Sequence, residues 1–467
     1  MRFSMSGNSQ HLIRLQTVIL VSLLSLLVSR DSSIGNRVKF SFSLLFMTLM
    51  MALPNTTFAQ NDVWSLTLAD AQAMARERNI DLKLARTAID AAKANVEIAG
   101  AAPNPSLTIA TNSINTANGG GSGRLWNRSI DSILRIDQLI ERGGKRELRQ
   151  ENAQTLLQAV QSEVVDTERQ LRLLVTQAYV DLKAAQEKRA AAIETSRLME
   201  SMLSAAQLRK SAGDIAGSDV ERVRVDALRS KNDLESASGE LAVARRMLAL
   251  LIGLAESIDK LEAVDPWAEL VGPAPLSDAR LKEIISLRPD VKAAQARVDA
   301  ADAGNRLAQS LRTRDVSVGM QYEHFPQPGD ATNSNGNSVG FSVQVPLFTR
   351  YYYKGEILAA ESARTAAEQS FQRARAVAEN EISTAWSTLT SAAERVRRNR
   401  DELLLAAEKS ANAAEFAYKN GAVGVMDVLD ARRTLRATRL DALAAQVEFS
   451  KALAAWQAAT EITQESR

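Results

Sequence analysis

The stretch "KNGAVGVMDVLDARRTLRAT" (Lys419–Thr438) repeats the plan of an earlier one, "KSAGDIAGSDVERVRVDALR" (Lys210–Arg229). In each, a glycine is followed six residues later by an aspartate and then a valine. Such a glycine commonly ends a helix, and an acidic residue suits the first turn of the next helix. The sequence therefore predicts the same helical turn twice. The matched positions are Gly213 and Gly421, then Asp219 and Asp427.

A second match extends the repeat towards the start of each half. "DLKLARTAIDAAKANVEIA" (Asp81–Ala99) corresponds to "DVKAAQARVDAADAGNRLA" (Asp290–Ala308), 209 positions later. Repeats of this length identify a duplicated unit. We expect a first repeat over 60–264, a Pro-containing linker over 265–275 and a second repeat over 276–467.

Long helices dominate both halves. Residues 145–212 and 356–420 contain neither glycine nor proline, and about 65 residues at 1.5 Å each give a rod of about 100 Å. Returning helices are expected over about 218–253 and 425–462. Their apolar residues recur every three or four positions, as in coiled coils.

Four segments alternate between apolar and polar residues, as β-strands do. They cover about 106–114, 129–137, 316–325 and 339–348, in two pairs separated by Gly-rich loops. Alternation of this length is typical of outer-membrane strands, although a soluble hairpin would show it too. Four strands cannot close a membrane barrel, because the smallest has eight, and open edges are costly in lipid. Chains in a membrane would have to share one barrel, with two chains giving eight strands or three giving twelve.

The N-terminal region is predicted to be a targeting segment, residues 1–59, cleaved after Ala59. Of its two apolar runs, 17–28 and 40–53, the second precedes small residues suited to signal peptidase. The first run is either half of a membrane hairpin or lies upstream of a translation start near residue 38. The chain has no Cys, which suits export to an oxidising compartment.

Several motifs together resemble the TolC family of outer-membrane channels. They are "LTLADAQAMARERNIDLKLAR", "AAPNPSL", "LLIGL" and above all "NGAVGVMDVLDAR". Within the family the chain is most similar to the outer-membrane subunits of cobalt-zinc-cadmium and nickel efflux systems. The resemblance implies a mainly α fold with a membrane β-part. Three chains would share a 12-stranded barrel in the outer membrane, and their helices would form a periplasmic α-barrel.

The resemblance also implies partners and site residues. A homotrimer in outer-membrane lipid would work with a periplasmic adaptor and an inner-membrane RND pump. Asp427 and Asp430 would form the periplasmic gate, and Tyr418 could reach Asp219 as a latch between hairpins. The hairpin tips, where adaptors dock, are at Gly213, Asp219, Gly421 and Val423. Val423 stands where the family has an arginine, so one expected latch is missing.

Plainer interpretations remain open. On spacing alone, the two aspartates could form a solvated acidic helix start. Positive and negative residues are balanced, 57 against 55, which disfavours nucleic acid as a partner. Beyond the targeting segment the only histidine is His324, so we expect no enzyme activity, no cofactor and no selective metal site. The alternatives are a duct for drug efflux or type I protein secretion, or a soluble periplasmic coiled-coil scaffold.

Overall fold

The computed structural model describes residues 64–112, 114, 130–255, 258–270, 272, 276–324 and 336–461. The predicted targeting segment 1–59, with its cleavage after Ala59, lies outside these ranges. So do most of the two strand-connecting loops and part of the 265–275 linker.

Both halves fold by the same plan of two short helices, two strands and a long helical hairpin. The first half contains β1 (Trp64–Leu66), α3 (Leu68–Arg78), α4 (Ile80–Gly100), β2 (Ser106–Asn112), β3 (Asp131–Ile140), α5 (Lys145–Ala212), α6 (Gly217–Leu251), η2 (Ile258–Lys260) and β4 (Leu261–Ala263). The second contains α7 (Asp278–Leu287), α8 (Pro289–Ser310), β5 (Val316–His324), β6 (Asn337–Gln344), α9 (Lys354–Arg398), the π-helical turn η3 (Asn399–Leu403), α10 (Leu404–Lys419) and α11 (Val425–Thr460). The fold is mainly helical and duplicated, as the sequence predicts.

The strands form one antiparallel sheet in the order β2-β3-β5-β6. β3 and β5 join the two repeats, with Ile136 opposite Met320. One face of the sheet is apolar, and its side chains are exposed because none of the residues that the structure describes covers them. The exposed residues on this face include Leu107, Ile109, Leu134, Ile136, Val318, Met320, Val339, Phe341 and Val343.

The opposite face of the sheet is polar. There Arg135 pairs with Asp137 at 2.8 Å and donates to Ser342 at 3.2 Å. The sheet therefore separates an apolar side from a polar side, and among the described residues both outer strands, β2 and β6, have one edge without a paired strand.

β6 is shorter than predicted. It ends at Gln344, whereas the alternating pattern continues to Phe348. Pro346 has no N–H to donate to a ladder, and β6 has a paired neighbour on one side only. Val345 and Leu347 continue the apolar alternation and are 40% and 75% exposed.

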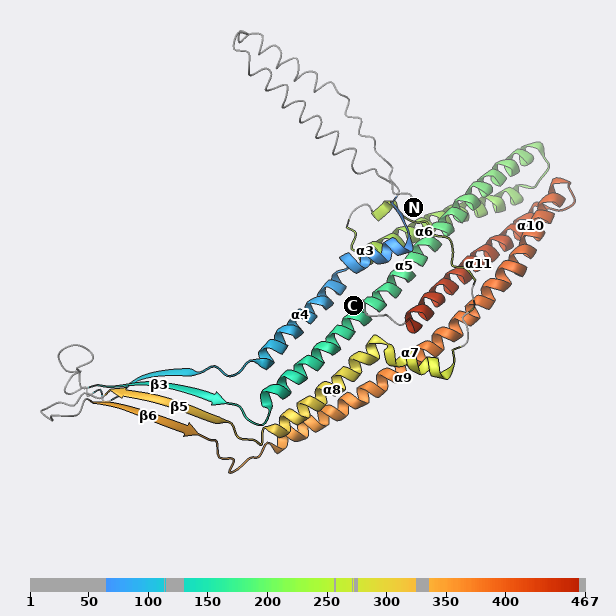
Figure 1. Cartoon of the computed structure of the whole chain (residues 1–467). Coiled ribbons are helices and arrows are strands. Elements are labelled where there is room, and N and C mark those ends of the chain that lie inside the picture. The colour runs from blue at the N-terminus through green and yellow to red at the C-terminus, as the bar shows by residue number, and fades with distance from the viewer. Residues whose placement is uncertain are drawn as a thin grey trace, which may run out of the picture. The chain divides into compact units, whose positions relative to one another are not determined.

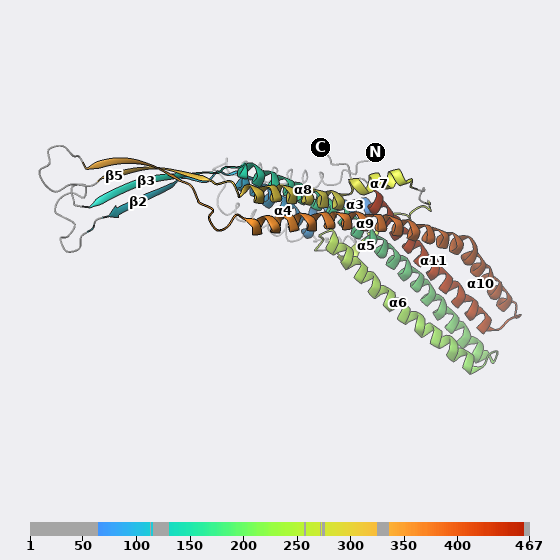
Figure 2. The ribbon, with the colours of Figure 1, turned by 90° about the horizontal axis from the view of Figure 1, so that it is seen from below.

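The helices run away from the sheet, and the hairpin turns lie at the far end (Figures 1 and 2). α5 packs against α4, α6, α8 and α11, while α9 packs against α8 and α11. Within the described residues, no helix is apolar over enough of its length to cross a bilayer.

Tyr179 anchors the main core where α5 passes the small parallel sheet of β1 and β4. Its hydroxyl donates to the Leu66 carbonyl at 2.9 Å and lies 3.0 Å from the Asp265 carboxylate. Burial raises the pKa of Tyr179 to about 12, so this hydroxyl stays a donor at physiological pH. It ties the start of the linker to the middle of the long helix.

Candidate functional site at the hairpin tips

The two hairpin turns have the same backbone geometry. Gly213 and Gly421 are left-handed, with φ of 86° and 74°. After each glycine, the next N–H reaches back to close a helix-ending loop: Asp214 donates to the Arg209 carbonyl at 2.9 Å and Ala422 to the Ala417 carbonyl at 2.8 Å. This is the Schellman motif, in which the residue after the helix adopts a left-handed conformation. Glycine is favoured there because it has no β-carbon to cause strain. Both glycines thus reverse the chain at the tip.

Asp427 and Asp430 lie in the first turns of α11, and both are exposed. The Asp427 carboxylate accepts the Gly424 backbone N–H at 3.0 Å, so it caps the helix it belongs to. Asp430 is 68% exposed and pairs with Arg433 at 2.9 Å. The spacing of three residues places both carboxylates on one helix face.

The structure gives Tyr418 and Asp219 different partners from the pairing that we expected. The Tyr418 hydroxyl accepts from Arg209, whose guanidinium carbon lies 4.8 Å from the ring centroid. Asp219 lies 3.9 Å from Arg222 on its own helix, α6. Tyr418 still links the two hairpins, but through the long helix α5. Val423 is half-buried in the second turn.

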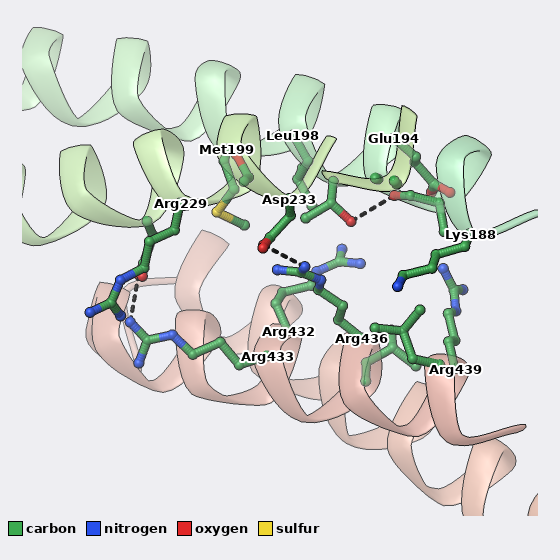
Figure 3. A pocket seen from close by; sticks show the side chains of 18 of the residues that line it. Lys188, Glu194, Leu198, Met199, Arg229, Asp233, Arg432, Arg433, Arg436 and Arg439 are labelled. Carbon is green, nitrogen blue, oxygen red and sulfur yellow. Dashed lines mark hydrogen bonds and ion pairs between the residues drawn. The ribbon is translucent and has the colours of Figure 1, made fainter. Parts of the chain in front are cut away.

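A row of arginines on α11 faces the first hairpin. Arg433 pairs with Asp226 at 2.6 Å, and Arg436 pairs with Asp233 at 2.6 Å. Figure 3 shows Arg436 reaching from α11 to Asp233 on α6 across a cavity between the hairpins. The cavity has a volume of about 850 Å³. Further lining residues include Lys188, Glu194, Arg229, Arg432 and Arg439.

Closer to the tip the same hairpins share an apolar contact. Leu429 of α11 is 1% exposed and packs with Val223 and Met199 of the first hairpin. Behind it, Glu415 of α10 pairs with Lys419 at 3.0 Å and also contacts Arg432. Lys419 and then Arg432 hold the pKa of Glu415 below its ordinary value. The Glu415 pairs lie within the second hairpin, whereas the apolar contact of Leu429 and the ion pairs of Arg433 and Arg436 join the two hairpins.

Sequence reasoning identified the turns and the aspartates but missed the arginine row. Its signal was present in "DARRTLRATR", where Arg433 and Arg436 lie three residues apart on one helix face, whereas Arg432 and Arg439 pair with Glu415 and Glu408 of α10. Charges at that spacing usually indicate a solvated face. Only the packing of α11 on the first hairpin distinguishes an ion-paired row from a solvated one.

A family model described as "Outer membrane efflux protein" matches residues 72–254 and 281–460. The two matched segments correspond to the two repeats.

Two bacterial proteins and one solved structure are similar over most of the chain. The "Cobalt-zinc-cadmium resistance protein CzcC" of Cupriavidus metallidurans is 25% identical over 418 residues, covering 85% of this chain and 94% of that protein. The "Cation efflux system protein CusC" of Escherichia coli O157:H7 is 23% identical over 406 residues, covering 81% and 84%. A crystal structure of a membrane protein from Pseudomonas aeruginosa has the same fold, with a TM-score of 0.72 at 18% identity, covering 84% of this chain and 90% of that one.

Proposed function

The chain belongs to the outer membrane efflux protein family, and on that premise we propose that it is the exit duct of a tripartite RND-type efflux system for divalent heavy-metal cations. The duct is passive. As an efflux protein of the outer membrane, the chain is a transport component and no enzyme.

The observation that carries the proposal is the two-faced sheet at one end of long helices. Its exposed apolar side chains, such as Phe341 at 79%, suit lipid, and its polar face suits a water-filled lumen. Tyr351 and Tyr352 are half-exposed just beyond β6. Aromatic residues at this place favour the boundary between lipid tails and head groups.

The open edges of the sheet require further copies of the chain, and we propose that three copies form the duct. Unpaired strand edges are not tolerated in lipid, so β2 and β6 require partners. Three chains would close a sheet of twelve strands, within the range of known outer-membrane proteins. The helices would then extend into the periplasm as a shared tunnel.

We assign the gate to Asp427 and Asp430. Two carboxylates per chain would place six around the threefold axis, and rings of acidic side chains select cations. The link between Tyr418 and Arg209 and the ion pairs of Arg433 and Arg436 would hold the hairpins together at rest.

The hairpin tips are the proposed docking site for a periplasmic adaptor, which would connect the duct to an inner-membrane pump. Gly213 and Gly421 are exposed, and no neighbouring atom lies within 4 Å of a β-carbon placed on either. Asp219 and Val423 lie beside them and are half-buried. The tips are therefore accessible to another protein.

Metal cations are supported as the cargo by the names of the relatives, which include cobalt-zinc-cadmium resistance and cation efflux proteins. The sequence has no Cys, and His324 is its only His past residue 60. Selective sites for zinc, cobalt or nickel use those ligands, so selection would reside in the pump or adaptor. A duct for drugs or for type I protein secretion is the alternative. The family assignment sets the soluble-scaffold alternative aside.

Deleting the gene and then restoring it tests the cargo. Loss of cobalt, zinc, cadmium or nickel resistance, with unchanged resistance to drugs, is expected. A strain that loses only drug resistance or a secreted protein would favour the alternative. Fractionation of membranes tests the assembly separately, since the protein should appear as an outer-membrane trimer.

A further inference from the structure

The segment that joins β6 to α9 contains a cluster of aromatic rings around Phe348. Its ring packs edge-on against Tyr353 and Tyr352, with centroids 5.3 Å and 6.4 Å apart. The guanidinium carbon of Arg314 lies 5.4 Å from the centroid of the Phe348 ring. An aromatic face holds an arginine in place while leaving its charge and its hydrogen-bond donors available. The cluster therefore presents a positioned guanidinium beside an exposed ring, since Tyr352 is 57% exposed.

The cluster lies where the apolar face of the sheet ends. Val345 and Leu347 continue that face beyond β6, and both are exposed. Extending the antiparallel alignment of Ser317 with Gln344 by three residues places Arg314 beside Leu347. Residues opposite one another lie on the same face of a sheet. Arg314 is thus at the edge of the apolar face, at the end of the sheet that is nearer the helices (Figure 1).

The carboxylates around this boundary are engaged within the chain. Asp315, the neighbour of Arg314 in the sequence, pairs with Lys145 at 2.8 Å. Glu356, in the first turn of α9, accepts a hydrogen bond from the Tyr351 hydroxyl at 2.7 Å. Neither carboxylate is paired with an arginine of the boundary, so the positive charge there is not neutralised by these groups.

Two arginines at the boundary present their charge to the surroundings. Arg314 and Arg350 are exposed, and within the described ranges neither forms an ion pair. In the first repeat, 209 residues earlier, Pro105 and Glu141 occupy these positions. Glu141 accepts from Arg149 there at 2.9 Å. The exposed pair of arginines is therefore a feature of the second repeat and occurs once in each subunit.

The surroundings of this boundary contain phosphate groups. The helices extend into the periplasm, so the end of the sheet nearer to them lies at the periplasmic leaflet of the outer membrane, which consists of phospholipids. Guanidinium groups bind phosphate oxygens through paired hydrogen bonds, and tyrosines favour the same interfacial level. A phospholipid with a net negative charge is attracted more strongly by exposed arginines than a zwitterionic one.

We propose that Arg314 and Arg350, together with the rings of Phe348 and Tyr352, bind the phosphate of an anionic phospholipid from the periplasmic leaflet. The acyl chains of this lipid lie along the apolar face of β6, and the lipid anchors the junction between β6 and α9 at the level of the head groups. The proposal rests on the placement of the sheet in the bilayer proposed above, and it goes further by assigning a lipid site to named residues.

Lipid binding by the purified protein tests the site. The protein is extracted in detergent, washed free of lipid, and titrated with phosphatidylglycerol or with phosphatidylcholine of the same acyl chains. Native mass spectrometry counts the lipids that remain bound. We expect one phosphatidylglycerol per subunit, bound at least about tenfold more tightly than phosphatidylcholine. Added salt should weaken this preference, because it screens exposed charges.

The variant Arg314→Gln with Arg350→Gln should bind the two lipids equally, because the guanidinium groups that recognise the phosphate are gone. The matched control is Arg197→Gln with Arg398→Gln, which removes the same charge from exposed arginines of α5 and α9. Neither of these arginines forms an ion pair with another described residue. The control should keep the preference of the wild type for phosphatidylglycerol.

Equal binding of the two lipids by the wild-type protein would overturn the site, and this comparison holds even if the double variant does not assemble. A double variant that assembles and keeps the preference would overturn it as well. Displacement of phosphatidylglycerol by inorganic phosphate would show a site for a free anion rather than for a lipid. A wild-type protein that does not fractionate with the outer membrane would instead refute the proposed duct.

Discussion

Gly144 and Tyr353 occupy the same backbone position in the two repeats, 209 residues apart, and both are left-handed, with φ of 68° and 57°. Each is the residue that precedes a long helix, α5 or α9. Glycine adopts this conformation without strain, whereas tyrosine does not. The Tyr353 ring packs edge-on against Phe348, with centroids 5.3 Å apart, and this contact offsets the strain.

Two substitutions separate ring packing from backbone strain. Tyr353→Ala and Tyr353→Gly both remove the ring, but alanine keeps the left-handed strain. We expect the alanine variant to be less stable than the glycine variant by about 1 kcal/mol, measured by thermal unfolding of the purified protein. Gly144→Ala is the control in the first repeat, where a β-carbon meets nothing within 4 Å and only the backbone cost applies. Equal stability of the two Tyr353 variants would mean that the backbone relaxes.

The gate proposal predicts a change in ion selectivity. Asp427→Asn with Asp430→Asn should weaken cation selectivity and abolish block by multivalent cations added on the periplasmic side, because six carboxylates are neutralised. Stability should change by under about 0.5 kcal/mol, since an asparagine oxygen can still accept the Gly424 N–H. Single-channel recording in planar bilayers is the measurement. Asp219→Asn, the same position in the first repeat, is the control and should leave block unchanged; selectivity that survives in the double variant would place these aspartates away from the pore.

The ion pair between Arg433 and Asp226 predicts an effect on the closed state. The Asp226 side chain is only 11% exposed, so removing its partner leaves a poorly solvated charge. Arg433→Gln should loosen the hairpins and increase conductance at rest. The exchange of Asp226→Arg with Arg433→Asp should return conductance towards the wild-type value. An exchange variant as leaky as Arg433→Gln would argue that the arginine acts through Asp430 instead.

The ion pairs of Arg288 predict that the stability of the protein depends on pH in the acidic range. It is 2% exposed and pairs with Asp290 at 2.7 Å and Glu381 at 2.6 Å. Burial alone would raise the pKa of Asp290, but the Arg288 guanidinium outweighs burial and holds this pKa below its ordinary value. The resulting stability is fully present above the unfolded pKa of about 3.9 and is lost as pH falls through the lower folded pKa.

Arg288→Met should therefore destabilise the protein by about 3 kcal/mol at neutral pH. The difference from wild type should begin to shrink below about pH 4 and should be lost as pH falls through the lower folded pKa of Asp290, where this carboxylate is protonated in the wild type as well. Denaturant unfolding at pH 7 and at a series of pH values below 4 measures it. A difference that stays constant with pH would show that lost packing of the arginine stem, rather than its charge, is responsible.

The duplicated fold could be predicted because its signals are local. A glycine turn, a helix without breakers and an alternating strand each depend on nearby residues, as at Gly213 and in the 145–212 helix. The contacts of the candidate site depend on how two hairpins pack. Nothing near Tyr418 in the sequence indicates that Arg209 would be its partner, and Asp219 is as plausible by spacing. The end of β6 at Gln344 could not be predicted either, because the apolar alternation continues through Val345 and Leu347.

The contact between Lys145 and Asp315 has a mechanical consequence. Lys145 is 7% exposed, and its ammonium lies 2.8 Å from both Asp315 oxygens and from the Thr313 carbonyl. By the repeat offset, the positions that correspond to Lys145, Asp315 and Thr313 are Lys354, Ser106 and Asn104, so the second such set has no carboxylate. A ring of three such chains would contain six contacts between neighbouring repeats. Three of these contacts would include the ion pair between Lys145 and Asp315, and three would lack an equivalent ion pair. If the ring widened, the contacts without the ion pair would separate first. The widening would therefore have threefold rather than sixfold symmetry.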